Sequence, residues 1–217
     1  MTPVDAMFWV VCLVLVVAGT SKVSAPQLVA PTFAALLSGR SGKEPAGRSG
    51  DGSSGVWVAR TLGAVELLVG IVALTVGGVA AAVAVAVTYV VFAGVVVMAR
   101  RRGLASCGCF GLRSAPPSWV HVAVNAVSSA IAVGAAVAAD GPVPVADGLE
   151  DLGGLPAVVV VVLVVVATAL VVVLDTTVAD AVESARSSKA RGRARMSTGD
   201  LEGDHGSSND RGRTVTR

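Results

Sequence analysis

Residues 156–174 read PAVVVVVLVVVATALVVVL, a run without a single charged side chain. In water, so many β-branched valines would favour a strand. In a bilayer, a lone strand would leave its backbone N–H and C=O groups unpaired, whereas a helix pairs them within the segment. A helix of about 20 residues is long enough to cross the hydrocarbon core. The run therefore predicts a transmembrane helix.

The composition agrees with an integral membrane protein. The chain has 217 residues, of which 53% are hydrophobic and 15% charged, and its mean hydropathy is +0.75. Soluble domains carry roughly 25% charged residues. The net charge of only +2 argues against a nucleic-acid partner, because such domains show a dense basic face. Three cysteines are too few for a secreted disulfide scaffold.

Four further apolar runs predict an all-α, polytopic helix bundle. The first could be read as a signal peptide cleaved near Ala25, but no Lys or Arg precedes it, so we expect a retained helix. The two prolines Pro116 and Pro117 open the fourth run, where a helix tolerates them. The expected spans are residues 6–23, 57–77, 79–99, 118–139 and 156–174. Residues 1–139 would form a four-helix core, to which the fifth helix is an addition.

The segments between the spans are expected to differ in character. Residues 27–37 are apolar but too short to span, and would lie at the interface or re-enter the membrane. Residues 38–55 have the Gly/Ser-rich composition of a flexible linker. Residues 141–154 form an acidic loop, and residues 175–217 a polar, disordered tail.

The basic residues predict the orientation. With five spans, every Lys and Arg falls on one side of the membrane, and the N-terminus, the Gly77–Gly78 turn and the acidic loop fall on the other. Cytoplasmic loops carry an excess of Lys and Arg. We therefore expect the N-terminus outside and the C-terminal tail in the cytoplasm.

Cys107 and Cys109 are the first candidates for chemistry, because a disulfide across a single glycine is strained and therefore easily reduced. Arg100 to Arg102 and Arg113 flank the pair, and positive charge favours the reactive thiolate. The alternative is that both are ordinary loop cysteines. We expect no metal site, because zinc needs about four Cys or His ligands and the remaining candidates, Cys12, His121 and His205, are scattered. Cys12 is expected to be a buried apolar residue.

Glu66 is the second candidate, because an ionisable group within a span is costly and suggests function. Lys22 and Arg60 are its candidate partners, and Gly63 and Gly70 on its helical face would let a neighbouring helix approach closely. His121 and Asn125 share one face of the fourth span. The topology places all of these in the same half of the bilayer as the cysteines. The alternative is a hydrogen-bond network that only holds the bundle together.

The chain also resembles the MauE family of membrane proteins, which is related to DoxX-type proteins and named for methylamine utilisation. The resemblance covers about residues 6–139. It is carried by Ala18-Gly19-x-x-Lys22 with Pro26, Arg60, Glu66-Leu67-Leu68-x-Gly70, Phe92 and Cys107-Gly-Cys-Phe-Gly111. It implies a four-helix domain associated with redox maturation of a disulfide-rich client. Cys107 and Cys109 would be the redox pair, and Lys22, Arg60 and Glu66 polar residues of the shared core.

Two hypotheses of different classes follow. The first is a membrane thiol–disulfide oxidoreductase with a thioredoxin-like or disulfide-containing client, whose polar cluster tunes thiol reactivity or binds a small redox carrier such as a quinone. The second is a non-enzymatic assembly factor or accessory subunit with structural cysteines. A small transporter rests on Glu66 alone, because we find no internal repeat.

Overall fold

The computed structural model describes residues 1–39, 52–104, 117–138, 141–173 and 177. Within these residues the regular secondary structure is all helical, and five helices are long and apolar enough to cross a membrane. The protein is therefore a multi-pass membrane protein in a lipid bilayer, as its composition predicts. Of the cytoplasmic tail expected at residues 175–217, all but residue 177 lies outside the described residues.

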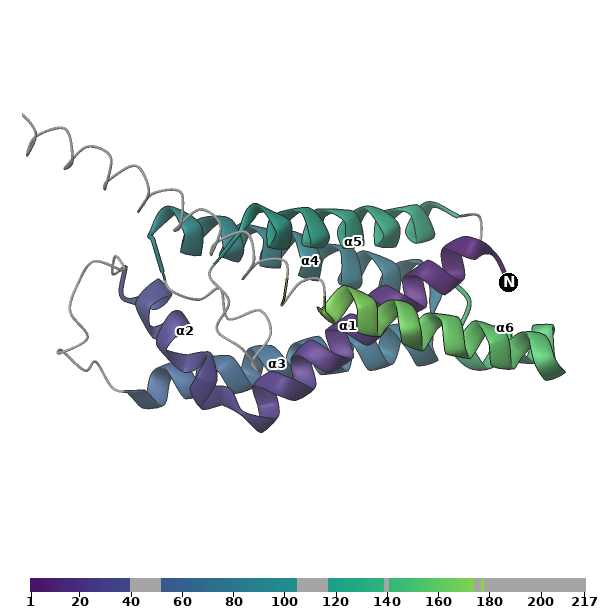
Figure 1. The fold of residues 1–217 in the computed structure, drawn as a ribbon, viewed down its shortest axis with the longest axis horizontal. Coiled ribbons are helices and arrows are strands. Elements are labelled where there is room, and N and C mark those ends of the chain that lie inside the picture. The colour runs from purple at the N-terminus through teal and green to yellow at the C-terminus, as the bar shows by residue number, and fades with distance from the viewer. Residues whose placement is uncertain (40–51, 105–116, 139–140, 174–176, 178–217) are drawn as a thin grey trace, which may run out of the picture. The chain divides into compact units, whose positions relative to one another are not determined.

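The helices are shown in Figure 1. The four spans of the expected core are α1 (Pro3–Ser24), α3 (Gly52–Thr75), α4 (Gly78–Arg101) and α5 (Trp119–Val137). The fifth span is Gly154–Val173. Three short elements connect them: the 3₁₀ helix η1 (Pro26–Leu28), α2 (Ala30–Leu37) and α6 (Val145–Leu152). All five spans begin and end within a few residues of the expected limits.

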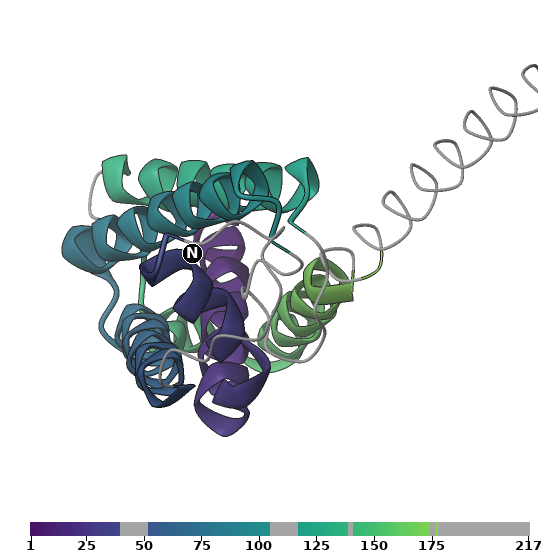
Figure 2. The same cartoon turned by 90° about the vertical axis from the view of Figure 1, so that its left-hand side faces the viewer.

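The span α1 is the most buried, with 56% of its apolar window inside the protein. Its start is fixed by a capping box, in which Thr2 and Asp5 satisfy each other's free backbone N–H groups. Pro3 occupies the first turn, where its missing N–H costs nothing. Figure 2 shows α1 between α3 and the Gly154–Val173 helix, with α4 and α5 along one side.

The four core spans associate as two close pairs. One pair is α1 with α3, and the other is α4 with α5, while the contacts between the pairs are sparser. Figures 1 and 2 show α4 and α5 lying side by side. The first pair is close because Gly19, Gly63 and Gly70 allow the two backbones to meet, as the small residues beside Glu66 predict.

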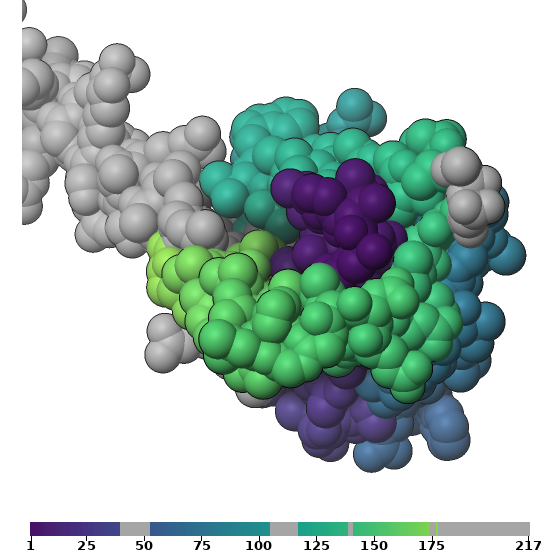
Figure 3. All heavy atoms as spheres, turned by 90° about the vertical axis from the view of Figure 1, so that its right-hand side faces the viewer, coloured from purple at the N-terminus to yellow at the C-terminus, as the bar shows by residue number. Residues whose placement is uncertain are grey.

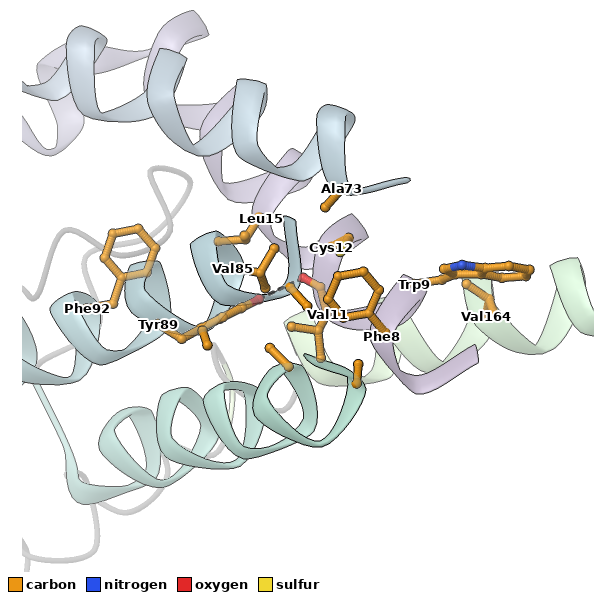
Figure 4. Packing of buried hydrophobic residues seen from close by; sticks show 14 residues of the cluster. Phe8, Trp9, Val11, Cys12, Leu15, Ala73, Val85, Tyr89, Phe92 and Val164 are labelled. Carbon is orange, nitrogen blue, oxygen red and sulfur yellow. Dashed lines mark hydrogen bonds between the residues drawn. The ribbon is translucent and has the colours of Figure 1, made fainter. Parts of the chain in front are cut away.

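Aromatic and aliphatic side chains fill the space between the pairs (Figure 4). Phe8, Cys12 and Leu15 of α1 are almost completely buried, and Val85 of α4 packs against them. The Tyr89 hydroxyl donates a hydrogen bond of 2.8 Å to the Val11 carbonyl oxygen and so ties α4 to α1. Cys12 is thus a buried, free thiol, as expected.

The segment 26–37 is helical and packs on α3, with Phe33 buried. Its last turn is capped by Arg102, whose Nη1 donates to the Leu36 carbonyl oxygen at 2.7 Å. The linker expected at residues 38–55 is shorter than the composition indicates. The helix α3 begins at Gly52, and Gly55 in its first turn packs its backbone directly against Ala30. Residues 40–51 lie outside the described residues.

The segment 141–154, expected as a loop, contains the amphipathic helix α6. It lies at the N-terminal end of α1, where Gly148 packs on the Trp9 ring and the Trp9 indole N–H donates to the Val143 carbonyl oxygen at 3.0 Å. Figure 3 shows the first residues of α1 surrounded by this segment and its neighbours. Gly77 lies at the same end of the bundle and has a φ of +65°, which glycine adopts readily. Its backbone packs against Pro142, where a Cβ would have no room.

The Gly154–Val173 helix packs loosely, with only 11% of its apolar window buried. Val164 and Thr168 are its buried side chains. Two apolar pockets flank it, one of about 390 Å³ against α1 and α5 and one of about 480 Å³ against α1, α3 and α6. Most of the remaining valines are exposed, as lipid-facing side chains are.

Candidate functional site

The strongest polar contact in the bundle joins α1 to α3. Lys22 Nζ lies 2.6 Å from Glu66 Oε2, and the two side chains are only 2% and 1% exposed. Of the two partners expected for Glu66, the structure therefore brings Lys22 to it. The contact forms because Gly63, one turn before Glu66, receives the Lys22 Cβ against its backbone.

A third side chain reaches the pair from α4. The Phe92 ring centroid lies 5.3 Å from Lys22 Nζ, within the range of a cation–π interaction. Tyr89 packs edge-on against the same ring, with 6.3 Å between the ring centroids. The ion pair therefore belongs to the α1–α3 pair but faces α4 of the other pair.

One oxygen of this site has no hydrogen bond to any described residue. Glu66 Oε1 is buried and finds no donor in the part of the chain that the structure describes. Lys22 Nζ makes one hydrogen bond there, to Oε2, although an ammonium carries three protons. An unpaired buried acceptor costs about 1–3 kcal/mol, and none of the donors of Lys22 reaches Glu66 Oε1.

Arg60 is exposed on α3, and the structure does not bring it to Glu66. It lies six residues before Glu66 in sequence, which is more than one and a half helical turns. Lys22 reaches the carboxylate from the neighbouring helix instead. Arg60 thus stays a candidate by sequence position alone.

His121 and Asn125 are buried, and their contacts include hydrogen bonds at the start of their own helix. The Ser118 backbone N–H donates to His121 Nδ1 at 3.3 Å, and Ser118 Oγ lies 2.8 Å from the same nitrogen. The Asn125 amide nitrogen donates to the His121 carbonyl oxygen at 2.6 Å. Both residues therefore shape the N-terminus of α5.

Cys107 and Cys109 lie outside the described residues, as does Arg113. The segment that carries them joins the C-terminus of α4 to the N-terminus of α5. The residues on either side of this segment are packed: Leu104 is buried, and the Arg100 guanidinium lies over the Trp119 ring, 4.9 Å from its centroid. Lys22 lies in the last turn of α1, toward the end of the bundle where this segment begins and ends, and Glu66 lies near the middle of α3.

Sequence reasoning missed two buried residues at the opposite end of the bundle. Asp5 accepts hydrogen bonds from Thr2 and from the Val143 backbone N–H. The second is Trp9, which is 2% exposed, whereas the other two tryptophans, Trp57 and Trp119, are 69% and 56% exposed. The spacing Thr2-x-x-Asp5 is the signal for the first; nothing in the sequence indicates the second.

Comparison with known proteins gives one match. The family model described as methylamine utilisation protein MauE matches residues 2–138, which run from the start of α1 to the end of α5. The fifth helix lies beyond the matched part. No curated protein and no solved structure matches the chain significantly. Because the family model covers well over half of the sequence, this four-helix core with its added fifth span belongs to the MauE family.

Proposed function

We propose that this chain is a membrane thiol–disulfide redox protein that supports maturation of a disulfide-containing client. The observation that carries the proposal is the Cys107-Gly-Cys109 sequence in the segment between α4 and α5 of a MauE-family bundle. Arg100, Arg101 and Arg102 end α4 directly before it. Positive charge stabilises a thiolate, and a short cysteine spacing favours a disulfide that is readily reduced.

The exchange needs only the two cysteines and the client. The thiolate of one cysteine attacks a sulfur of the client disulfide, which breaks the S–S bond and forms a mixed disulfide between the two proteins. The second cysteine then attacks the mixed disulfide as a thiolate. The client leaves with two reduced sulfurs, and Cys107 and Cys109 are left as a disulfide; the reverse sequence oxidises a client.

The family description, methylamine utilisation protein, is the reason to seek the client in that system. A redox enzyme of that system, or another protein with several disulfides, is the client class that fits. A thioredoxin-like protein is the partner that fits the next step, in which Cys107 and Cys109 return to the redox state they had before meeting the client. Thiol–disulfide exchange passes electrons between such proteins.

A trapping experiment tests the exchange. In cells that carry the full-length chain, Cys107→Ser and Cys109→Ser are made singly and together, and mixed disulfides are detected on non-reducing gels and by mass spectrometry. Loss of the resolving cysteine should accumulate a mixed disulfide that the double variant lacks. Cys12→Ser is the matched control, because Cys12 is buried within α1. If neither single variant traps a protein or changes the redox state of any client, the proposed exchange is wrong.

The orientation belongs to the same proposal. The basic residues favour an outside N-terminus and a cytoplasmic C-terminus, which puts the cysteine segment at the cytoplasmic face. Thiols are kept reduced in that compartment, so the pair would relay electrons from cytoplasmic thiols toward an exported client. A membrane-impermeant maleimide applied to intact cells should leave Cys107 and Cys109 unlabelled and should label them after permeabilisation. If both cysteines are labelled in intact cells, the cysteine segment lies outside and the proposed orientation is wrong.

The structure also supplies an observation that favours the second hypothesis, an assembly factor that binds a partner protein. His121 and Asn125 form hydrogen bonds at the start of α5, and Lys22 and Glu66 join α1 to α3; contacts of this kind would also hold together a bundle that only binds a partner. In that case both cysteine substitutions leave client maturation intact, while Glu66→Gln disrupts a complex that is recovered by mild detergent extraction.

A further inference from the structure

We propose that the groove between α1, α5 and the Gly154–Val173 helix binds one anionic phospholipid, with an acyl chain in the groove and the phosphate beside Arg100. Two separate observations carry the inference. One is an apolar cavity among the membrane-spanning helices, and the other is an arginine held at the end of that cavity. The inference goes beyond the proposed redox function and does not depend on it.

The lining of the groove suits a hydrocarbon chain. Its volume is about 390 Å³, and its lining side chains are apolar except for Ser128. The groove opens toward the bilayer, because Met7 and Val127 in its lining are 54% and 60% exposed. A cavity with such a lining excludes water, and lipid chains are as apolar as the side chains around it. An acyl chain from the surrounding bilayer therefore fills it.

The length of the groove matches a chain of one leaflet. On α5 its lining runs from Ala123 to Ile131, and Trp119 lies one turn before Ala123. The path from Trp119 to Ile131 rises about 18 Å along the helix. Half of a hydrocarbon core that is about 30 Å thick measures about 15 Å. An acyl chain whose head group lies at Trp119 therefore extends to the far end of the groove.

A cation marks the head-group end of the groove. The Arg100 guanidinium lies over the Trp119 ring, 4.9 Å from its centroid. Trp119 is 56% exposed, as tryptophans at the level of the lipid head groups are. Ala123 follows Trp119 at a spacing of i, i+4, so the two are neighbours on the surface of α5. The stacked arginine is thus placed where a head group lies when its chain occupies the groove.

The charges at this end favour an anionic head group over a zwitterionic one. Arg100 and Arg101 end α4 at this level, and neither has a carboxylate partner among the described residues. A guanidinium that stacks on a ring keeps its N–H edge for oxygens, and arginine binds a phosphate with two parallel hydrogen bonds. Phosphatidylglycerol brings a net negative charge to these cations, whereas phosphatidylcholine also brings a quaternary ammonium that they repel.

The lipid lies between the family core and the added helix. Val14 of α1 and Ile131 of α5 line the groove from the part of the chain that the family model matches, and Val171 lines it from the fifth helix. The acyl chain therefore contacts both. It attaches the loosely packed fifth helix to the core through lipid in addition to the few side chains that meet directly.

Photolabelling of the full-length chain in nanodiscs tests the site. The discs consist of phosphatidylcholine with a small fraction of phosphatidylglycerol that carries a diazirine at the end of one acyl chain. Labelled residues are identified by mass spectrometry. The label should map to Val10, Ile131 and Ala167, which line the groove away from Arg100. Added unlabelled phosphatidylglycerol should remove this label, and the same amount of added phosphatidylcholine should leave most of it.

A pair of alanine variants tests the groove. In Ala123→Phe a ring lies across the groove next to Trp119, and the label should fall several-fold. Ala126→Phe is the matched control, because Ala126 is exposed on the same helix and lies outside the lining of the groove. Circular dichroism checks that both variants keep the helical content of the unaltered chain.

A pair of arginine variants tests the head-group contact. Arg100→Gln removes the cation over Trp119, and the label should fall about fivefold, the usual effect of one cation beside an anionic membrane surface. Arg60→Gln removes the same charge from an exposed position on α3, which does not line the groove, and should leave the label unchanged. The comparison separates a local contact from general attraction of the lipid to a basic surface.

Three outcomes overturn the proposal. The first is a groove label that phosphatidylcholine removes as well as phosphatidylglycerol does, which would show that any lipid fills the groove. The second is an equal loss of label in Arg100→Gln and Arg60→Gln. The third is an equal label in Ala123→Phe and Ala126→Phe, which would place the probe on the outer surface of the spans.

Discussion

The α1–α3 contact and the Gly154–Val173 helix differ in how a transmembrane helix is packed in the bundle. Three glycines bring the backbones of α1 and α3 together, and a buried ion pair joins them. The fifth helix is the most hydrophobic of the spans, with a mean hydropathy of 3.2 in its apolar window, yet only 11% of that window is buried. Hydropathy thus measures how readily a helix enters the bilayer and not how firmly it packs.

The physical reason is that lipid tails are as apolar as valine. A valine that leaves lipid for a protein neighbour gains little, because no water is released. Close backbone approach and interhelical polar contacts are what hold spans together. The comparison therefore predicts that stability is concentrated where the sequence contains glycine, lysine and glutamate, and is nearly absent where it is richest in valine.

The largest effect is expected from splitting the ion pair. Lys22→Met leaves the Glu66 carboxylate buried without its partner, which typically costs about 3–5 kcal/mol. The measurement is reversible unfolding in mixed micelles, followed by circular dichroism as denaturing detergent is added. The double variant Lys22→Met/Glu66→Met should recover most of the loss. If it is as unstable as the single variant, the pair is not the source of the effect.

A smaller loss is expected when a methyl group is placed between α1 and α3. In Gly19→Ala the new Cβ would lie 2.7 Å from the Gly63 carbonyl oxygen, and backbone cannot move aside cheaply. Overpacking of this kind costs about 1–3 kcal/mol. Gly94→Ala on α4 is the matched control, because no atom lies within 4 Å of its Cβ position. Equal unfolding midpoints for the two variants would show that the close approach contributes nothing.

This interface was largely predictable from the sequence. Hydropathy located the five spans, and Glu66 with Gly63 and Gly70 on one helical face indicated both a polar partner and a close neighbour. Finding Lys22 as the partner needed the structure, because Lys22 lies on another helix and only the mutual rotation of α1 and α3 decides whether it meets the carboxylate. Arg60 lies on the same helix as Glu66, and a separation of six residues already places the two side chains on different faces.

The opposite end of the bundle was less predictable. The segment 141–154 was expected as a loop because Asp147, Glu150 and Asp151 dominate it, yet Val145 and Leu149, one turn apart, pack against the core. An amphipathic helix this short is hard to tell from a turn-rich loop by composition. The burial of Trp9 depends on that helix, so it could not be expected once the helix was missed.

The contact between Trp9 and this segment should be worth less than either feature of the α1–α3 contact. Trp9→Phe keeps an aromatic ring under α6 but removes the hydrogen bond to the Val143 carbonyl oxygen, and a net hydrogen bond contributes about 1 kcal/mol. Trp57→Phe is the control, because Trp57 is 69% exposed. The same unfolding titration measures both, and a loss at Trp57 as large as that at Trp9 would contradict the assignment.

The smallest effect is expected from removing the most hydrophobic helix. Truncation after Gly153 deletes the fifth span and leaves α1 to α6 intact. Its buried side chains are only Val164 and Thr168, and Thr168 bonds the Val164 carbonyl oxygen of its own helix rather than another helix. The apolar pockets on both sides of it, of about 390 and 480 Å³, show how little of its surface is in close contact.

Because lipid can replace those valine contacts, the free energy of unfolding of the remaining bundle should fall by less than about 1 kcal/mol. The truncated chain should also keep the Lys22–Glu66 contact, so Lys22→Met should destabilise it about as much as it destabilises the full-length chain. A loss as large as that of Lys22→Met would mean that packing of the fifth helix stabilises the family core. In that case burial in this bundle would follow hydropathy after all, and the contrast between the two regions would fail.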